Sequence, residues 1–382
     1  VYADIVAYLR ARFPANFVEL TENLRQLENR ATGKGCGILK LAACFINRAV
    51  RGEQDETEEQ SVSREKLLSR LHEGGEVDKD LSIFYWHDEE RLAQQIIDQV
   101  VEDFTTEENQ SKSGSVKLGK ALQKNINAMQ ILSPVRGELY GTENINQSVQ
   151  AFKSVYWLER GAIDGIAMYD KVIQIRNIQK RFPLTAYNFD TKKTEKVQIF
   201  NGEIGGVVPK GIGSEVNRNS RCPGFRLKDF SVQFTGKKNL SVNYCTNVNS
   251  MPENNLELAY AISVHKAQGS EFERIYFVLP KGSASSQMME MIYTALTRAS
   301  THCTVFVQGG VESFVNNMRP EQSALKSINS SLFEFKPVNE LIATKRDWYE
   351  AGKIHRALAG DMVRSKSEVI IANMLHERGI TF

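Results

Sequence analysis

The stretch from Leu258 to Phe272, LAYAISVHKAQGSEF, constrains the fold of this chain most strongly. Its apolar first half is typical of a buried strand, and its second half is a polar turn that contains a glycine. Further along the chain, Met291–Ser300, MIYTALTRAS, is typical of a helix that ends in an arginine. Parallel α/β sheets alternate strands and helices in this way and bind ligands beyond the carboxyl ends of their strands. The sequence therefore predicts an α/β fold with a ligand site at the turn.

Composition sets wide limits on the class of protein. The chain has 382 residues, 41% of them hydrophobic and 25% charged, which allows about two to three domains. Its net charge of +2 does not exclude a nucleic-acid partner, because acidic residues elsewhere can balance a basic groove. The five cysteines contain no C-x-x-C pair, and the sequence has no signal-peptide pattern or long apolar run. We expect a cytoplasmic protein with reduced thiols, no metal site and no membrane partner.

Changes in composition and hydrophobic pattern along the chain predict its organisation. The predicted parts are a helical segment at 1–50, a charged excursion with connecting helices at 51–127, an α/β domain at 128–169 and 251–312, a small inserted β-barrel at 170–250, and a helical segment at 313–382. Residues 128–134, AMQILSP, are typical of a buried strand that ends abruptly at a proline. The barrel is indicated by several short β-type runs separated by Gly and Asn turns.

Arg298 is the main candidate for chemistry in the predicted helix through 288–300. Apolar residues fall on one face of that helix, and Arg298 lies at the edge of this face, from which it can reach a neighbouring domain. An arginine in such a place can stabilise charge on a phosphate as it is transferred. The alternative is an ordinary amphipathic helix whose last turn carries a cation favourable to its dipole.

Two strings resemble motifs of superfamily 1 helicases of the RecD-like and UvrD-like kinds. HKAQGSEF resembles motif V, and Tyr293–Ala299, YTALTRA, resembles motif VI. The resemblance implies an ATP-driven DNA motor and a second RecA-like domain, that is, a fold of the P-loop NTPase type. It implies that Arg298 is an arginine finger. It also implies that nucleotide is bound by Gln268, Gly269 and Glu271, and that DNA is bound by His265, Lys266 and Thr294. Without the resemblance, a lone histidine such as His265 is more often structural than functional.

Shorter strings extend the same resemblance. Residues 20–26, LTENLRQ, resemble motif IV, which implies that Arg25 faces the γ-phosphate; the alternative is a solvated helix start. Two strings, QILSPVRG at 130–137 and GTENINQ at 141–147, resemble the first strand of the second RecA-like domain and the segment that follows it. This resemblance implies DNA contacts from Ser133 and Arg136. NGEIG, at 201–205, resembles a turn of the inserted barrel. The barrel either tracks the DNA backbone or is simply a folded insertion.

One segment imitates a phosphate-binding loop. Gly114–Ala121, GSVKLGKA, differs from the Walker A pattern because Ala121 has no hydroxyl for Mg²⁺, and a polar loop precedes it instead of a strand. Neither another phosphate loop nor an acidic D-E-x-x strand occurs in the sequence. The resemblance therefore implies that 1–50 are the end of a first motor domain whose remainder is a missing partner. It implies ATP and Mg²⁺ as cofactors of the intact enzyme, with none bound tightly by this chain.

The end of the sequence carries a further, weaker resemblance. Residues 363–382 predict an amphipathic helix with inward-facing Val369, Ile370, Ala372 and Leu375, and they resemble the opening helix of PD-(D/E)XK nuclease domains, with Glu368 at the acidic position. A surface-docked helix is the alternative. We expect the C-terminal part of an ATP-dependent DNA helicase, of the kind used in repair or recombination, that binds single-stranded DNA and is inactive alone as an ATPase. The alternative is an ATP-independent nucleic-acid-binding or protein-docking module.

Overall fold

The computed structural model describes residues 8–9, 11–13, 33, 35–46, 58–159, 162, 165–178, 183–209, 229–237, 239–245, 255–281, 288–319, 322–323, 355–358, 362–363 and 366–377. These residues divide into two compact units, one formed by 2–327 and one formed by residue 1 together with 328–382. Each unit is described by itself.

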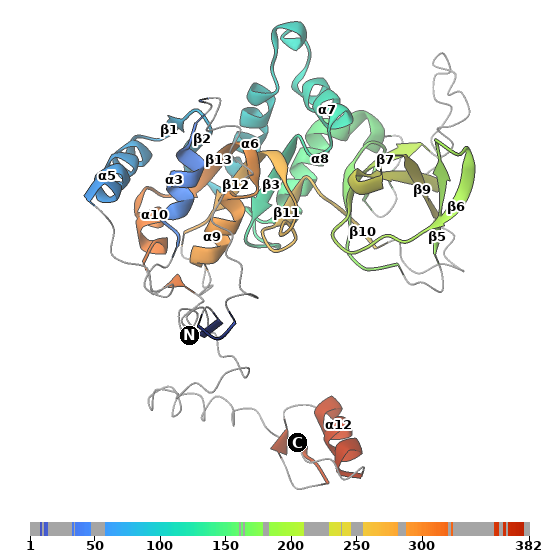
Figure 1. Cartoon of the computed structure of the whole chain (residues 1–382). Helices are drawn as coiled ribbons and strands as arrows, with labels where there is room; N and C mark the ends of the chain where they lie inside the picture. Colours follow the sequence, from blue (N-terminus) through green and yellow to red (C-terminus); the bar gives the residue numbers. More distant parts are fainter. Residues whose placement is uncertain are drawn as a thin grey trace. The chain divides into compact units, whose positions relative to one another are not determined.

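A six-stranded sheet forms the centre of the larger unit (Figure 1). In sheet order its strands are β1 (Gly75–Asp78), β2 (Leu81–Trp86), β13 (Ala299–Gln308), β12 (Phe272–Leu279), β3 (Met129–Ser133) and β11 (Ala261–Ser263). All neighbours from β2 to β11 are parallel, and β1 pairs antiparallel with β2. Parallel sheets are covered on both faces, which explains why the five residues of β3, MQILS, are all buried. The predicted α/β domain therefore has the expected parallel core.

Helices cover both faces of this sheet. On one face lie α3 (Gly37–Ala43), α9 (Met288–Leu296) and α10 (Glu312–Asn317); on the other lie α6 (Glu89–Asp103), α7 (Gly114–Lys124) and α8 (Thr142–Leu158). Because side chains alternate along a strand, β12 serves both cores. Ile275 and Phe277 pack with the first set of helices, and Tyr276 and Val278 pack with the second set.

A second sheet of seven strands is wholly antiparallel. Its strands in sheet order are β10 (Leu256–Leu258), β4 (Lys171–Gln174), β7 (Ile204–Pro209), β8 (Asp229–Phe234), β9 (Leu240–Cys245), β5 (Leu184–Asn188) and β6 (Lys193–Val197). The predicted insertion is thus rich in short strands. Within the described residues, β10 and β6 are the two edges of this sheet and do not pair with each other, so the predicted small barrel is not confirmed.

Several predicted boundaries differ from the structure. Residues 51–127 contain β1 and β2, which belong to the central sheet, and α5 (Glu58–Glu73), whose Leu67 and Leu71 are buried. Strand β10 belongs to the seven-stranded sheet although it lies beyond residue 250. The helix predicted through 288–300 ends at Leu296, because Ala299 pairs with Phe272 as β13 begins.

Other segments of the sequence also have definite places. Residues 114–121, which imitate a phosphate loop, lie in helix α7, and Lys117 of this segment is buried and donates to Thr105. Of residues 1–50, only 8–9, 11–13, 33 and 35–46, which contain α3, are described. No helix in the described part of the chain is long and apolar enough to cross a membrane.

The smaller unit contains the two-stranded pair β14 (His355–Arg356) and β15 (Met362–Val363) and helix α12 (Lys366–Glu377). The helix predicted at 363–382 is therefore present in part. Ala372 is buried as expected, whereas Ile370, predicted to face inward, has 69% of its surface exposed.

Candidate functional site

Residues 264–271 form a turn that runs along the central sheet from the carboxyl end of β11 to the amino end of β12. Ser263 lies opposite Ser133, the last residue of β3. Arg274 lies opposite Met129, the first residue of β3, so Phe272 lies beyond the amino end of that strand. At about 3.3 Å per residue, the two ends of the turn are separated by about 20 Å along the strands. One turn therefore joins two separate candidate sites.

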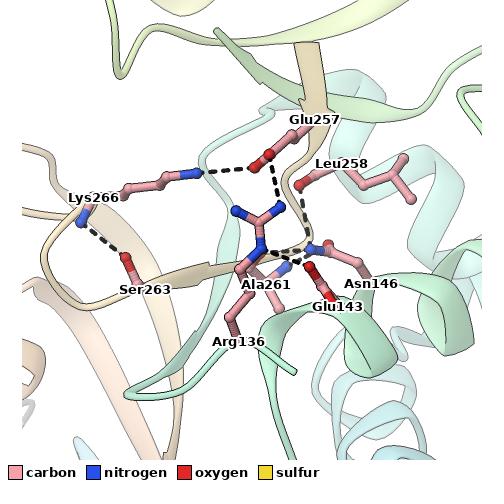
Figure 2. A network of polar contacts seen from close by, with 8 residues as sticks. All are labelled: Arg136, Glu143, Asn146, Glu257, Leu258, Ala261, Ser263 and Lys266. Carbon is pink, nitrogen blue, oxygen red and sulfur yellow. Dashed lines mark hydrogen bonds and ion pairs between the residues drawn. The ribbon is translucent and has the colours of Figure 1, made fainter. Parts of the chain in front are cut away.

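At the carboxyl end, two cations share one carboxylate (Figure 2). Arg136 Nη2 donates to Glu257 Oε1 at 3.0 Å, and Lys266 Nζ donates to Glu257 Oε2 at 3.0 Å. Arg136 Nε also donates to Glu143 Oε1 at 2.6 Å. The hydrogen bond that Arg136 donates to Glu143 is the largest cause that raises the pKa of Arg136, and the negative charge of Glu257 is the next largest. Burial alone would raise the pKa of Glu257, but Lys266 and Arg136 together lower it, so this carboxylate is ionised at neutral pH.

A cavity of about 610 Å³ opens beside these cations, between the two sheets. Residues that line it include Arg136, Lys266, Glu257, Glu143, Asn146 and Gln150. Asn146 of α8 fixes the crossing from β10 to β11: its Nδ2 donates to the carbonyls of Leu258 and Ala261, and its Oδ1 accepts from the Ala261 N–H at 2.8 Å. Helix α8 thereby holds Glu257 at the mouth of the cavity.

Ser133 and His265 lie at the same end of the sheet but differ in exposure. Ser133 is fully buried, and its hydroxyl donates to the carbonyl of Tyr140 at 2.9 Å. That contact fixes the loop between β3 and α8, which carries Arg136. His265 is exposed at the start of the turn. Of these two predicted DNA contacts, the structure leaves only His265 at the surface.

At the amino end, Arg298 follows α9 and contacts the far end of the turn. Its Nε donates to the carbonyl of Thr294 at 3.1 Å, and its Nη1 donates to the carbonyl of Ser270 at 3.3 Å. Gly269 has a φ of +82°, which favours glycine at that point of the turn. Gln268 and Glu271 beside it are exposed. The predicted nucleotide-binding residues are therefore grouped with Arg298.

Thr294 and Arg25 are the remaining predicted site residues. Thr294 lies in α9, where its hydroxyl donates to the carbonyl of Glu290 at 2.8 Å. Its carbonyl accepts from Arg298, so it lies with the amino-end group and not with the cations with which it was predicted to bind DNA. Arg25, the motif IV candidate, lies outside the described residues.

A buried polar seam joins the two sheets behind the cavity. Asp170 is fully buried; its Oδ1 accepts from Ser154 Oγ and from Tyr260 Oη, each at 2.8 Å, and its Oδ2 accepts from Gln150 Nε2. The neighbouring Lys171 is also fully buried, and its Nζ donates to the Met129 carbonyl at 2.7 Å.

Sequence reasoning missed Glu257, Glu143 and Asn146, which complete the carboxyl-end site. The strings that resembled helicase motifs do not include Glu257, and Arg136 is 121 residues away from it in the chain. The segment 141–147 did contain Glu143 and Asn146, so a helix beginning there was the available signal. Nothing local in the sequence indicated which cations these residues would meet.

Comparisons with known proteins show what this chain is similar to. Residues 258–306 match the UvrD-like helicase C-terminal domain family, a range that contains both ends of the turn. The ATP-dependent RecD2 DNA helicase of Deinococcus radiodurans is 30% identical over 181 residues, covering 45% of this chain and 19% of that protein. The RecBCD enzyme subunit RecD of Haemophilus influenzae is 23% identical over 266 residues, covering 63% of this chain and 34% of that protein.

The same comparisons include a protein and a structure that add less. An uncharacterised protein of Methanocaldococcus jannaschii is 29% identical over 214 residues, 56% of this chain and 16% of its own length. A crystal structure of Pif1 helicase from Bacteroides with ADP-AlF3 and ssDNA aligns at 13% identity and a TM-score of 0.29, covering 88% of this chain and 57% of that one. The chain spans 16% to 34% of these three curated relatives. It is similar to the C-terminal part of superfamily 1 helicases, which confirms the family predicted from its motifs.

Proposed function

We propose that this chain is part of an ATP-dependent DNA helicase and supplies one side of its strand site and one side of its nucleotide site. The observation that carries the proposal is the turn 264–271, which has Lys266 near one end and contacts Arg298 through Ser270 at the other. A single short segment that contacts both the nucleotide site and the strand site is suited to couple closure around the nucleotide to movement of the strand.

Arg136 and Lys266 are the proposed contacts to the phosphate backbone of single-stranded DNA. A guanidinium binds two phosphate oxygens at once, and an ammonium adds a compact charge. Both cations lie at the carboxyl ends of parallel strands, where α/β sheets bind ligands. His265, exposed next to Lys266, is placed to extend the contact by one phosphate.

Arg298, Gln268 and Glu271 are the proposed contacts to ATP. ATP supplies the phosphoanhydride bond whose hydrolysis drives such a motor. Arg298 would offer guanidinium N–H groups to phosphate beside those that donate to the carbonyls of Thr294 and Ser270, while Glu271 is suited to accept from a ribose hydroxyl. Among the described residues, no group of three or more His, Cys, Asp or Glu could hold a metal. The donor set fits one side of a nucleotide.

Binding of labelled oligothymidine at several salt concentrations tests the strand site. Each phosphate contact to a single strand contributes about −0.7 to the slope of log K against log salt. We expect Lys266→Ala to weaken binding and to make the slope shallower by about 0.7. Lys196→Ala, on exposed positions of edge strand β6, is the matched control. Slopes equal in all three proteins would contradict the proposal.

The nucleotide site is tested by ATP hydrolysis. We expect the 382-residue chain to show no turnover by itself. Turnover that disappears in Arg298→Ala would refute this expectation and would place a complete catalytic site within the chain.

The contacts of Arg298 also favour a second candidate function. Its guanidinium donates to the carbonyl of Thr294 in the last turn of α9 as well as to that of Ser270, and the first contact is the arrangement expected of a cation that only stabilises a helix end. The chain would then be an ATP-independent nucleic-acid-binding module. In that case Arg298→Ala lowers the melting temperature without changing the binding of a fluorescent ATP analogue. A motor fragment instead loses analogue binding and keeps its affinity for DNA.

A further inference from the structure

Glu257 holds both cations of the proposed strand site with its two oxygens. Oε1 accepts from Arg136 and Oε2 accepts from Lys266, each at 3.0 Å. The Glu257 side chain is 30% exposed, compared with 65% for Arg136 and 35% for Lys266. The Glu257 side chain is therefore less exposed to solvent than either cation with which it pairs (Figure 2), and all three residues line the cavity.

We propose that Glu257 is a built-in competitor for the phosphate backbone, occupying its position until a strand displaces it. The proposal rests on the strand site proposed above. A carboxylate that bridges an arginine and a lysine through two oxygens uses the same donors that a phosphate would use. Because Glu257 belongs to the chain, it competes at a fixed effective concentration that dilution does not lower.

The fold holds Glu257 in place independently of the cations. Its strand β10 pairs with β4, where Glu257 lies opposite Ile173. The carbonyl of the next residue, Leu258, accepts from Asn146 at 3.2 Å. The backbone can thus stay fixed while the side chain turns away, so displacement needs no rearrangement of the sheet.

The charged groups at the site give displacement a direction. Arg136 keeps Glu143 as a second partner at 2.6 Å, so it stays oriented when Glu257 leaves. Lys266 exchanges one anion for another. Glu257 itself is repelled by an incoming phosphate and has solvent on its exposed side. The exchange therefore leaves both cations paired and releases only the carboxylate to water.

The experiment is oligothymidine binding by fluorescence anisotropy at low salt, using the full chain. Partly exposed ion pairs are each worth up to about a fivefold change in an equilibrium constant. We expect Glu257→Gln, which keeps the shape and removes the charge, to tighten binding by about threefold to tenfold. The gain should shrink as salt is raised, because salt screens the competing pairs.

Glu195→Gln is the matched control, since it removes the same charge from strand β6 of the same sheet. We expect it to leave binding unchanged. In the Lys266→Ala/Arg136→Ala background, Glu257→Gln should have no effect, because there is nothing left to compete for.

Three results would overturn the proposal that Glu257 competes with the phosphate backbone. Glu257→Gln could bind as the unaltered chain does, it could bind more weakly, or Glu195→Gln could tighten binding equally. In each case, loss of binding in the double-alanine protein would still support the strand site. If the affinity for oligothymidine were the same with and without Arg136 and Lys266, the proposed strand site would be overturned, and so would the proposed role of Glu257.

Discussion

Replacing Lys171 by methionine is expected to stabilise the chain at neutral pH and to remove a specific dependence of stability on pH. Lys171 is fully buried in the seam between the sheets, donates to the Met129 carbonyl, and has its ammonium over the ring of Phe272 at 5.3 Å. Burial lowers its pKa to about 7. Methionine has a similar length and carries no charge to desolvate.

The magnitude follows from the difference between this pKa and the value of about 10.4 in an unfolded chain. At pH 7 the unfolded state binds the proton much more strongly, which costs the folded state about 4 kcal/mol. At pH 9 this cost has fallen to about 2 kcal/mol, since folded Lys171 is then neutral and the unfolded lysine holds its proton less firmly. The folded pKa is depressed, so this contribution to stability rises with pH from about 7 to about 10.

Loss of the hydrogen bond to Met129 opposes the gain. An unsatisfied buried carbonyl costs about 1–3 kcal/mol. We therefore expect Lys171→Met to be more stable than the unaltered chain by about 2 kcal/mol at pH 7, and the difference to vanish near pH 9.

Urea unfolding followed by tryptophan fluorescence at pH 7, 8 and 9 measures this difference. Other titrating groups act on both proteins and cancel in the comparison. Lys196→Met, on exposed strand β6, controls for the change of residue type. If the stabilities of the unaltered chain and Lys171→Met changed in parallel between pH 7 and pH 9, the reasoning about the buried ammonium would be refuted.

Two further substitutions test the supports of the candidate site. A Cβ at Gly141 would lie 2.4 Å from the carbonyl oxygen of Arg136, so Gly141→Ala is expected to lower thermal stability and weaken oligothymidine binding, whereas Gly137→Ala, with open space around its Cβ, should change neither. Tyr260→Phe removes the hydroxyl that donates to Asp170 Oδ1 and should cost about 1–3 kcal/mol in urea unfolding; a change below about 0.5 kcal/mol would show that water replaces it.

The sequence predicted the strand at 128–134 and connecting helices within 51–127, where α6 lies, because their signals are local. An unbroken apolar run ending at a proline indicates a buried parallel strand, and the apolar face of α6 repeats at helical spacing. Strand β2, LSIFYW, was missed although its letters favour a strand. It follows a charge-dense region, and its place in the sheet depends on pairing with β13, more than 200 residues away in the chain.

The candidate site was predictable one residue at a time, but not as an arrangement. Short strings indicated Arg136, Lys266 and Arg298, yet no local pattern tells which of them lie at the same end of the sheet. The register of β12 against β3 decides that, and it separates Arg298 from the other two. The helix before Arg298 was predicted too long because strand pairing at Ala299 overrides its helical periodicity.

The seam between the sheets means that the seven-stranded sheet cannot be cut out as an independent module. Only Ala259 and Tyr260 separate β10 from β11, and Gln130 of the central sheet donates to the carbonyls of both. A deletion ending in this segment would leave Met129 without Lys171 and open the core on which β3 rests. A protein that kept this central sheet without the insertion would therefore need other side chains to meet Gln130 and the Met129 carbonyl of β3.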